Sequence, residues 1–128
     1  MALPLDHLTI LSRDPVASAA WYGLLLPLLG FEQQKPQIWR NANGLYLQFG
    51  PARPDTRPYE RHGAGMNHIG FAAPDIGFVE HVAAVMTAAG HEARLQRFGD
   101  GTVALFLPDP DGLRVEVSCY PPGTPPVD

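Results

Sequence analysis

Gly65-Met66-Asn67-His68-Ile69-Gly70-Phe71-Ala72-Ala73-Pro74-Asp75 has the form of a short β-strand followed by the start of a helix. Alternate residues of a strand lie on opposite faces, so the apolar face here is Ile69, Phe71 and Ala73. His68, Gly70 and Ala72 then lie on the other face. Pro74 ends the strand, and Asp75 is suited to cap a helix that begins just after it.

The same pattern occurs earlier in the chain. Leu5-Asp6-His7-Leu8-Thr9-Ile10 places His7 where the later copy has His68, and Asp14 where it has Asp75, each pair being 61 residues apart. Both following helices end near a glycine, Gly30 in one copy and Gly90 in the other. The chain is therefore predicted to contain one supersecondary unit twice, with a histidine near the start of the first strand of each.

The composition bounds the class of protein. The chain has 128 residues, 45% of them hydrophobic and 17% charged, as in an ordinary single globular domain. No apolar run approaches the ~20 residues that a membrane span needs, and the N-terminus lacks the features of a secretory signal. A net charge of −4 argues against nucleic-acid binding, and the single cysteine favours a cytoplasmic location.

Turn and capping residues divide each copy into strand, helix and three more strands. Asp14-Pro15 is a strong helix start, Pro27 is expected to end that helix early, and Asn43-Gly44 marks a hairpin. The predicted fold class is α+β: two βαβββ modules forming curved mixed sheets around a shared metal and substrate cavity. The expected organisation is a single domain with first repeat about 3–50, linker 51–65, second repeat about 66–119 and tail 120–128. The segment 50–65 is read as a solvated linker, with a lid over a pocket as the alternative.

In each copy the helix should cover one face of its sheet and leave the other face free. The free faces carry an unusual set of polar residues: His7, Thr9, Tyr46, Gln48, His68, Arg114 and Glu116. Two histidines in equivalent repeat positions and a carboxylate are common ligands of catalytic divalent metals. We therefore expect His7, His68 and Glu116 to bind a metal ion.

Other residues on these strands allow two readings. Gln48 can be a fourth metal ligand or can make a buried hydrogen bond. Trp39, Tyr46 and Phe106 can line an apolar substrate pocket or pack in the core. Arg114 can hold an anionic substrate group or form a surface salt bridge.

The paired βαβββ plan resembles the vicinal oxygen chelate superfamily, which contains glyoxalase I, extradiol dioxygenases, fosfomycin-resistance thiol transferases and bleomycin-binding proteins. The resemblance covers nearly the whole chain to about Cys119. It rests on these matching segments: Leu5-Asp6-His7-Leu8, Trp21-Tyr22, Leu28-Leu29-Gly30-Phe31, Met66-Asn67-His68-Ile69-Gly70-Phe71, Asp109-Pro110-Asp111-Gly112 and Val115-Glu116-Val117.

The resemblance implies metal ligands at His7, His68 and Glu116. Family glyoxalases often add a glutamate on strand four, where this chain has Gln48, and Thr9 matches a threonine used by the fosfomycin-resistance enzymes. The implied function is a metal-dependent lyase or dioxygenase that chelates two neighbouring substrate oxygens, with a proton-transfer reaction favoured and Glu116 as the candidate base. Zinc, nickel, manganese and iron remain open as the metal.

Two other functions remain open. One is a fosfomycin-resistance-like thiol transferase, and the other is a non-catalytic antibiotic-binding protein of the bleomycin-resistance type. The family also implies a small-molecule substrate and a homodimer, whose sites lie within one chain or between two chains.

Overall fold

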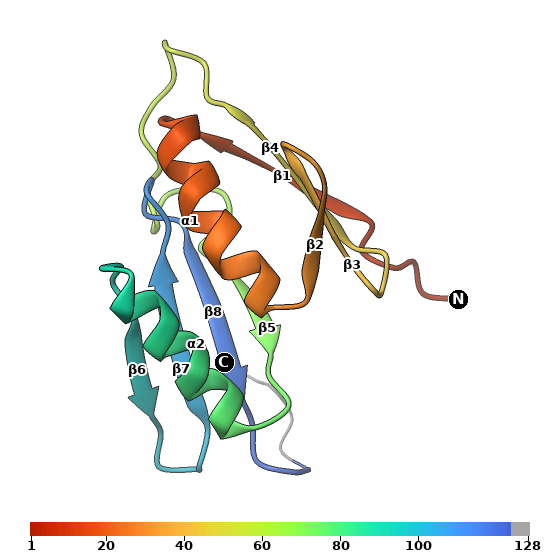
Figure 1. The fold of residues 1–128 in the computed structure, drawn as a ribbon, viewed down its shortest axis with the longest axis vertical. Coiled ribbons are helices and arrows are strands. Elements are labelled where there is room, and N and C mark those ends of the chain that lie inside the picture. Colours follow the sequence, from red (N-terminus) through yellow and green to blue (C-terminus); the bar gives the residue numbers. More distant parts are fainter. Residues whose placement is uncertain (124–128) are drawn as a thin grey trace. The chain divides into compact units, whose positions relative to one another are not determined.

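The computed structural model describes residues 1–123, and its ribbon is drawn in Figure 1. The chain forms two compact units, Met1–Pro58 and Tyr59–Asp128, each built around one four-stranded sheet and one helix. Within the described residues, no helix is both long and apolar enough to cross a membrane. Part of the predicted tail, residues 124–128, lies outside the described part of the chain.

The first unit has the strand order β1-β4-β3-β2 with a parallel β1–β4 pair and antiparallel neighbours elsewhere. This is the predicted strand-helix-strand-strand-strand plan with a mixed sheet. Its elements are β1 (His7–Ser12), α1 (Pro15–Leu28), β2 (Phe31–Lys35), β3 (Ile38–Asn41) and β4 (Tyr46–Pro51).

The helix α1 begins where the sequence places its cap. The Asp14 carboxylate accepts a hydrogen bond from the Ala17 backbone N–H at 3.1 Å, and Pro15 occupies the first turn, where its missing N–H is not needed. The helix packs its Tyr22 ring against Phe49, with ring centroids 4.6 Å apart. It therefore covers the face of the sheet that carries the buried Ile10 and Leu47.

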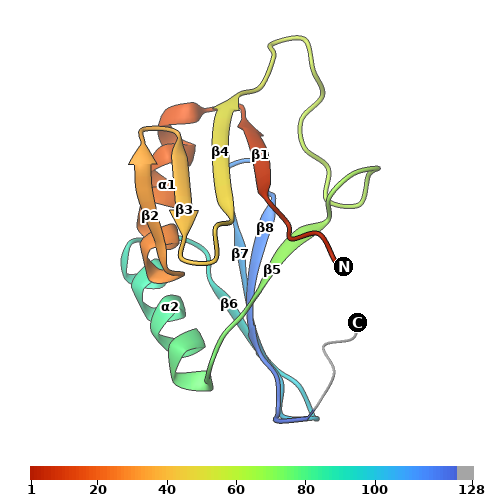
Figure 2. The same ribbon diagram turned by 90° about the vertical axis from the view of Figure 1, so that its right-hand side faces the viewer.

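The second unit repeats the plan with the strand order β5-β8-β7-β6, again with a parallel pair of first and last strands. Figure 1 shows α2 in front of β6, β7 and β8, all of which it contacts, and Figure 2 shows it from the side. The elements are β5 (His68–Ala72), α2 (Ile76–Ala88), β6 (Arg94–Arg97), β7 (Val103–Pro108) and β8 (Arg114–Cys119).

Apolar side chains of α2 and of one sheet face form the core of the second unit. The Asp75 carboxylate caps α2 by accepting from the Phe78 N–H at 2.7 Å, as predicted. Opposite faces of β7 and β8 follow the expected alternation, so that Leu105 pairs with Val117 inside while Phe106 pairs with Glu116 on the other face. The buried core comprises Val79, Val82, Met86, Leu105, Leu107, Val115 and Val117.

One expectation about α1 was wrong. Pro27 does not stop the helix early, because it lies inside the last turn and the helix ends at Leu28. Only the hydrogen bond that Pro27 would donate is lost, and the turn is still closed by the Leu29 N–H bonds to the Leu25 and Leu26 carbonyls. The Asn43-Gly44 turn is confirmed, with Gly44 at φ 90 and the Asn41 N–H bonded to the Leu45 carbonyl at 2.9 Å.

The segment between β4 and β5 has no helix or strand, yet side chains hold both of its halves. In the first unit the Arg13 guanidinium donates to the carbonyls of Arg53 at 2.9 Å and of Thr56 at 3.1 Å. In the second unit the Tyr59 hydroxyl donates to the Met66 carbonyl at 2.7 Å. The linker is thus attached to each unit by polar contacts.

Candidate functional site

The first residue of β5 is His68, and its neighbour in sequence orients the ring. The Asn67 side-chain N–H donates to the Arg61 carbonyl at 2.8 Å, which fixes that amide and turns its oxygen toward His68. The distance from this oxygen to His68 Nδ1 is 2.8 Å. An amide oxygen can only accept, so Nδ1 carries the hydrogen and Nε2 points the other way as the free ring nitrogen.

Glu116 on β8 faces that free nitrogen. Its Oε1 lies 3.4 Å from His68 Nε2, while its other oxygen accepts a hydrogen bond from the Ser118 hydroxyl at 2.5 Å. The parallel β5–β8 register places Glu116 beside Gly70, whose missing side chain leaves the carboxylate uncovered on that side. The carboxylate side chain is 17% exposed and is thus accessible but largely desolvated.

The pair has the separation that two ligands of one metal ion require. Zinc bonds of about 2.1 Å in tetrahedral geometry put two ligand atoms about 3.4 Å apart, which equals the separation of His68 Nε2 and Glu116 Oε1. The pair would equally form an ion pair if the imidazole were protonated on both nitrogens. The residues of the second unit therefore fit a divalent metal as two ligands of an incomplete set.

The histidine of the first unit is oriented in a similar way. His7 begins β1, and its Nδ1 lies 2.6 Å from the carboxylate of Asp6, the residue just before it. Its ring stacks on Tyr46 of β4, with centroids 4.7 Å apart and planes within 7°. A carboxylate–histidine pair of this kind is the usual support of a metal-binding imidazole, and it again leaves Nε2 free.

The remaining predicted residues divide between two faces of the sheets. In the first unit Thr9 pairs with Gln48 in the same register that pairs His7 with Tyr46, so these four side chains share the face that α1 does not cover. In the second unit Arg114 pairs with His68 on the corresponding face. The Arg114 guanidinium lies over the Phe106 ring, 4.9 Å from its centroid.

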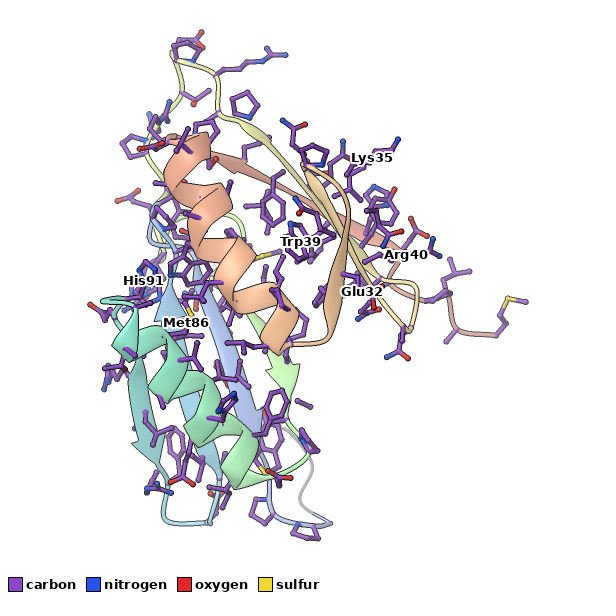
Figure 3. All side chains as sticks on the ribbon, viewed as in Figure 1. Glu32, Lys35, Trp39, Arg40, Met86 and His91 are labelled. Atoms are coloured by element: carbon purple, nitrogen blue, oxygen red, sulfur yellow. The ribbon has the colours of Figure 1, made fainter. Side chains whose placement is uncertain are left out.

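Trp39 is not among them. It pairs with Leu47, which faces α1, and a Cβ on Gly23 of that helix would lie 4.0 Å from the indole ring. Figure 3 shows Trp39 beside α1. Of the two readings of Trp39, this register favours packing beside the helix: Trp39 lies on the helix side of β3, whereas Arg40 faces the other way and pairs with Tyr46.

Three supporting residues escaped the sequence analysis. Asp6 and Asn67 each precede a histidine and accept from its Nδ1, and Ser118 holds Glu116 from two positions along the same strand. The repeat contained the signal for the first two, because a residue with an acceptor oxygen precedes the histidine in both copies.

Each unit thus gathers its own potential ligands: His7 with Gln48 nearby in one, and His68 with Glu116 in the other. Among residues 1–123, no three His, Cys, Asp or Glu side chains come together closely enough to hold a metal ion. The three predicted ligands, His7, His68 and Glu116, are therefore divided between the two units.

The fold and these paired residues agree with the comparison with known families. Residues 4–117 match the model of the Glyoxalase/Bleomycin resistance protein/Dioxygenase superfamily, and the chain belongs to that superfamily. This confirms the resemblance inferred from the repeated strand-helix motif, and with it the α+β fold of two βαβββ modules.

Three individual relatives are 16–29% identical to this chain. An uncharacterised Bacillus subtilis (strain 168) protein, YqjT, is 29% identical over 125 residues, which cover 88% of this chain and 96% of YqjT. The crystal structure of a candidate glyoxalase of Bacillus halodurans is similar with a TM-score of 0.78 at 25% identity, covering 90% of this chain and 94% of that one. A glyoxylase/bleomycin resistance protein/dioxygenase domain from Frankia sp. EAN1pec has a TM-score of 0.77 at 16% identity, covering 97% and 96%, and shows the fold alone.

Proposed function

We propose that this chain is a metal-dependent enzyme of the glyoxalase type, acting on a small molecule through two adjacent oxygens. His7, His68 and Glu116 would hold the divalent metal, with Gln48 as a fourth ligand. When bound, such a metal supplies Lewis-acid stabilisation of charge that develops on a substrate oxygen. Superfamily membership supports the class, and the preferred reaction is proton transfer of the lyase or isomerase kind.

One observation carries the proposal: the convergence of His68 Nε2 and Glu116 Oε1 at 3.4 Å, each oriented by its own hydrogen bond. Hydrogen bonds that orient the side chain in this way are the usual environment of metal-ligating histidines and carboxylates. The matching support of His7 by Asp6 adds the second histidine.

Glu116 is also the candidate general base. Its carboxylate is held in place by the Ser118 hydroxyl and is partly buried, so one of its oxygens is positioned to take a proton from a bound substrate. Thr9 and Tyr46 lie on the histidine face of the first unit and are the proposed substrate contacts there.

Arg114 is the proposed anchor for an anionic substrate group. Its Nε is buried and has no hydrogen-bond partner among the described residues. The guanidinium lies over the ring of Phe106, the residue of β7 that pairs with Glu116. A buried guanidinium N–H without an acceptor is costly, and a substrate carboxylate would satisfy it. We expect Arg114→Gln to raise KM for an anionic substrate and leave metal content unchanged.

Metal analysis of protein purified without added metal tests the proposal. The wild-type chain should retain close to one divalent metal ion per chain, and Glu116→Ala should lose most of it. Glu60→Ala is a matched control, because Glu60 is an exposed glutamate of the same unit. Full metal content in the Glu116→Ala protein would contradict the assignment, and a wild-type protein that binds antibiotics but no metal would favour the bleomycin-resistance type.

A further inference from the structure

The first unit contains a cavity on the helix side of its sheet, away from the histidine face. Its volume is about 370 Å³, and α1, β3 and β4 contribute to its walls. The rings of Tyr22, Trp39 and Phe49 lie among the lining residues. A cavity of this size falls in the range of sites for small organic molecules, about 300–1,000 Å³.

One polar group in this cavity lacks a partner. Ser18 lies on α1, is 2% exposed and lines the cavity, yet its Oγ makes no hydrogen bond within the described part of the chain. A buried hydroxyl left without a partner is destabilising by about 1–3 kcal/mol. Helical serines can bond to the carbonyl four residues earlier, but here the Asp14 carbonyl is bonded to the Ser18 N–H and not to its hydroxyl. The hydroxyl is therefore free to bond to a ligand.

The lining also restricts the charge of that ligand. Within the described residues, the cavity wall includes no Asp, Glu, Lys, Arg or His side chain. A charged molecule would lose its hydration there without gaining a charged partner, at a large cost in free energy. Three aromatic rings favour a flat ligand that can stack or pack edge-on.

From these features we infer that the cavity is a second binding site, for an uncharged aromatic molecule that carries one hydroxyl or carbonyl group. The aromatic body packs among Tyr22, Trp39 and Phe49, and the polar group bonds to the Ser18 hydroxyl. The site is separate from the proposed metal site, because its side chains lie on the opposite face of the sheet from His7 and Gln48.

An NMR titration with 1-naphthol tests this inference on the full-length protein. The two indole N–H signals belong to Trp21 and Trp39, and a Trp39→Phe protein assigns them. We expect the Trp39 signal to shift saturably, with the same dissociation constant in the presence of a metal chelator. Ser18→Ala should weaken 1-naphthol binding about three- to tenfold and leave naphthalene binding unchanged, since only the former can bond to the hydroxyl.

A matched pair of helix variants locates the site. Ala19 lines the cavity and Ala20 does not, and both are exposed, so neither substitution disturbs the core. Ala19→Phe should abolish the saturable shift, whereas Ala20→Phe should preserve it. The inference is overturned if the Trp39 signal of the wild-type protein fails to respond, if Ala19→Phe binds 1-naphthol as well as Ala20→Phe does, or if the chelator removes binding.

Discussion

At the scale of single residues, the same device serves both histidines. The Nδ1 atom of each ring lies beside a side-chain oxygen of the preceding residue, which orients the ring. This residue is Asp6 for His7 and Asn67 for His68. Adjacent residues in a strand point to opposite faces, but both acceptors precede the first strand residue, so this alternation does not prevent their side chains from reaching the imidazole. The imidazoles are therefore preorganised before any metal arrives.

Substitution of Asn67 tests this positioning role. Asn67→Ala removes the acceptor from His68 Nδ1, and we expect metal affinity to fall about 10–100-fold, as for other residues that orient a ligand. Asn67→Asp keeps an acceptor oxygen but loses the N–H bond to the Arg61 carbonyl, so it should retain more affinity than Asn67→Ala. Competition with a chromophoric chelator measures both affinities. Equal affinity of Asn67→Ala and wild type would show that the contact between Asn67 and His68 does not affect metal binding.

At the scale of elements, the two helix caps can be weighed against each other. Asp14→Ala and Asp75→Ala each remove a carboxylate that accepts from a first-turn N–H, and each should lower the free energy of unfolding by about 0.5–2 kcal/mol. Asp55→Ala is the control, because Asp55 is an exposed aspartate of the linker that caps no helix. Urea unfolding followed by circular dichroism gives the three values, and a loss as large for Asp55→Ala as for the caps would refute the capping argument.

The turn between β6 and β7 gives a prediction about pH. The backbone N–H of Thr102 and then its hydroxyl hold the pKa of Asp100 below its ordinary value of 3.8. A lowered pKa means that the ionised carboxylate stabilises the folded state at pH values above the pKa that the group has in the unfolded chain. This stabilisation disappears as the pH falls through the pKa of the group in the folded state. Thr102→Val should move the Asp100 pKa part of the way back, because only the backbone bond remains. A carboxyl-detected NMR titration measures this, and an unchanged pKa would exclude the hydroxyl.

Most elements could be predicted from the sequence because their signals are local. Asp14-Pro15, Asn43-Gly44 and Asp75 determine the helix starts and the hairpin through their own backbone preferences, and the repeat supplied the topology. Pro27 was misjudged because the loss of its one N–H bond does not stop the helix before Leu28, where the Leu29 N–H still closes the turn. The face on which Trp39 lies could not be predicted, because it depends on strand register, which a one-residue shift reverses.

The candidate site could be predicted as residue types, but not as an arrangement. His68 and Glu116 are 48 positions apart in the chain (116 − 68), and only the parallel pairing of β5 with β8 brings them together. The hydrogen bond of Ser118 to Glu116 depends on side-chain geometry that no spacing reveals. The types of the candidate ligands are therefore easier to predict from the sequence than the side-chain contacts that orient them.

At the scale of the whole molecule, the proposed ligands are divided between the two units. His7 and Gln48 belong to Met1–Pro58, while His68 and Glu116 belong to Tyr59–Asp128. A complete site needs both pairs to face each other, either within one chain or between the two chains of a homodimer. We propose the second arrangement, with each site shared between the two subunits of a homodimer.

Subunit exchange distinguishes the two arrangements. His7→Ala protein and Glu116→Ala protein, one of them isotopically labelled, are mixed under conditions that let dimers exchange. If sites are shared, each mixed dimer has one site with both defects and one with none, so about a quarter of all sites should regain metal after full exchange in an equal mixture. If each site lies within one chain, every site keeps one defect and none recovers. Native mass spectrometry reports exchange and metal content together, so mixed dimers that hold no metal would refute the shared site.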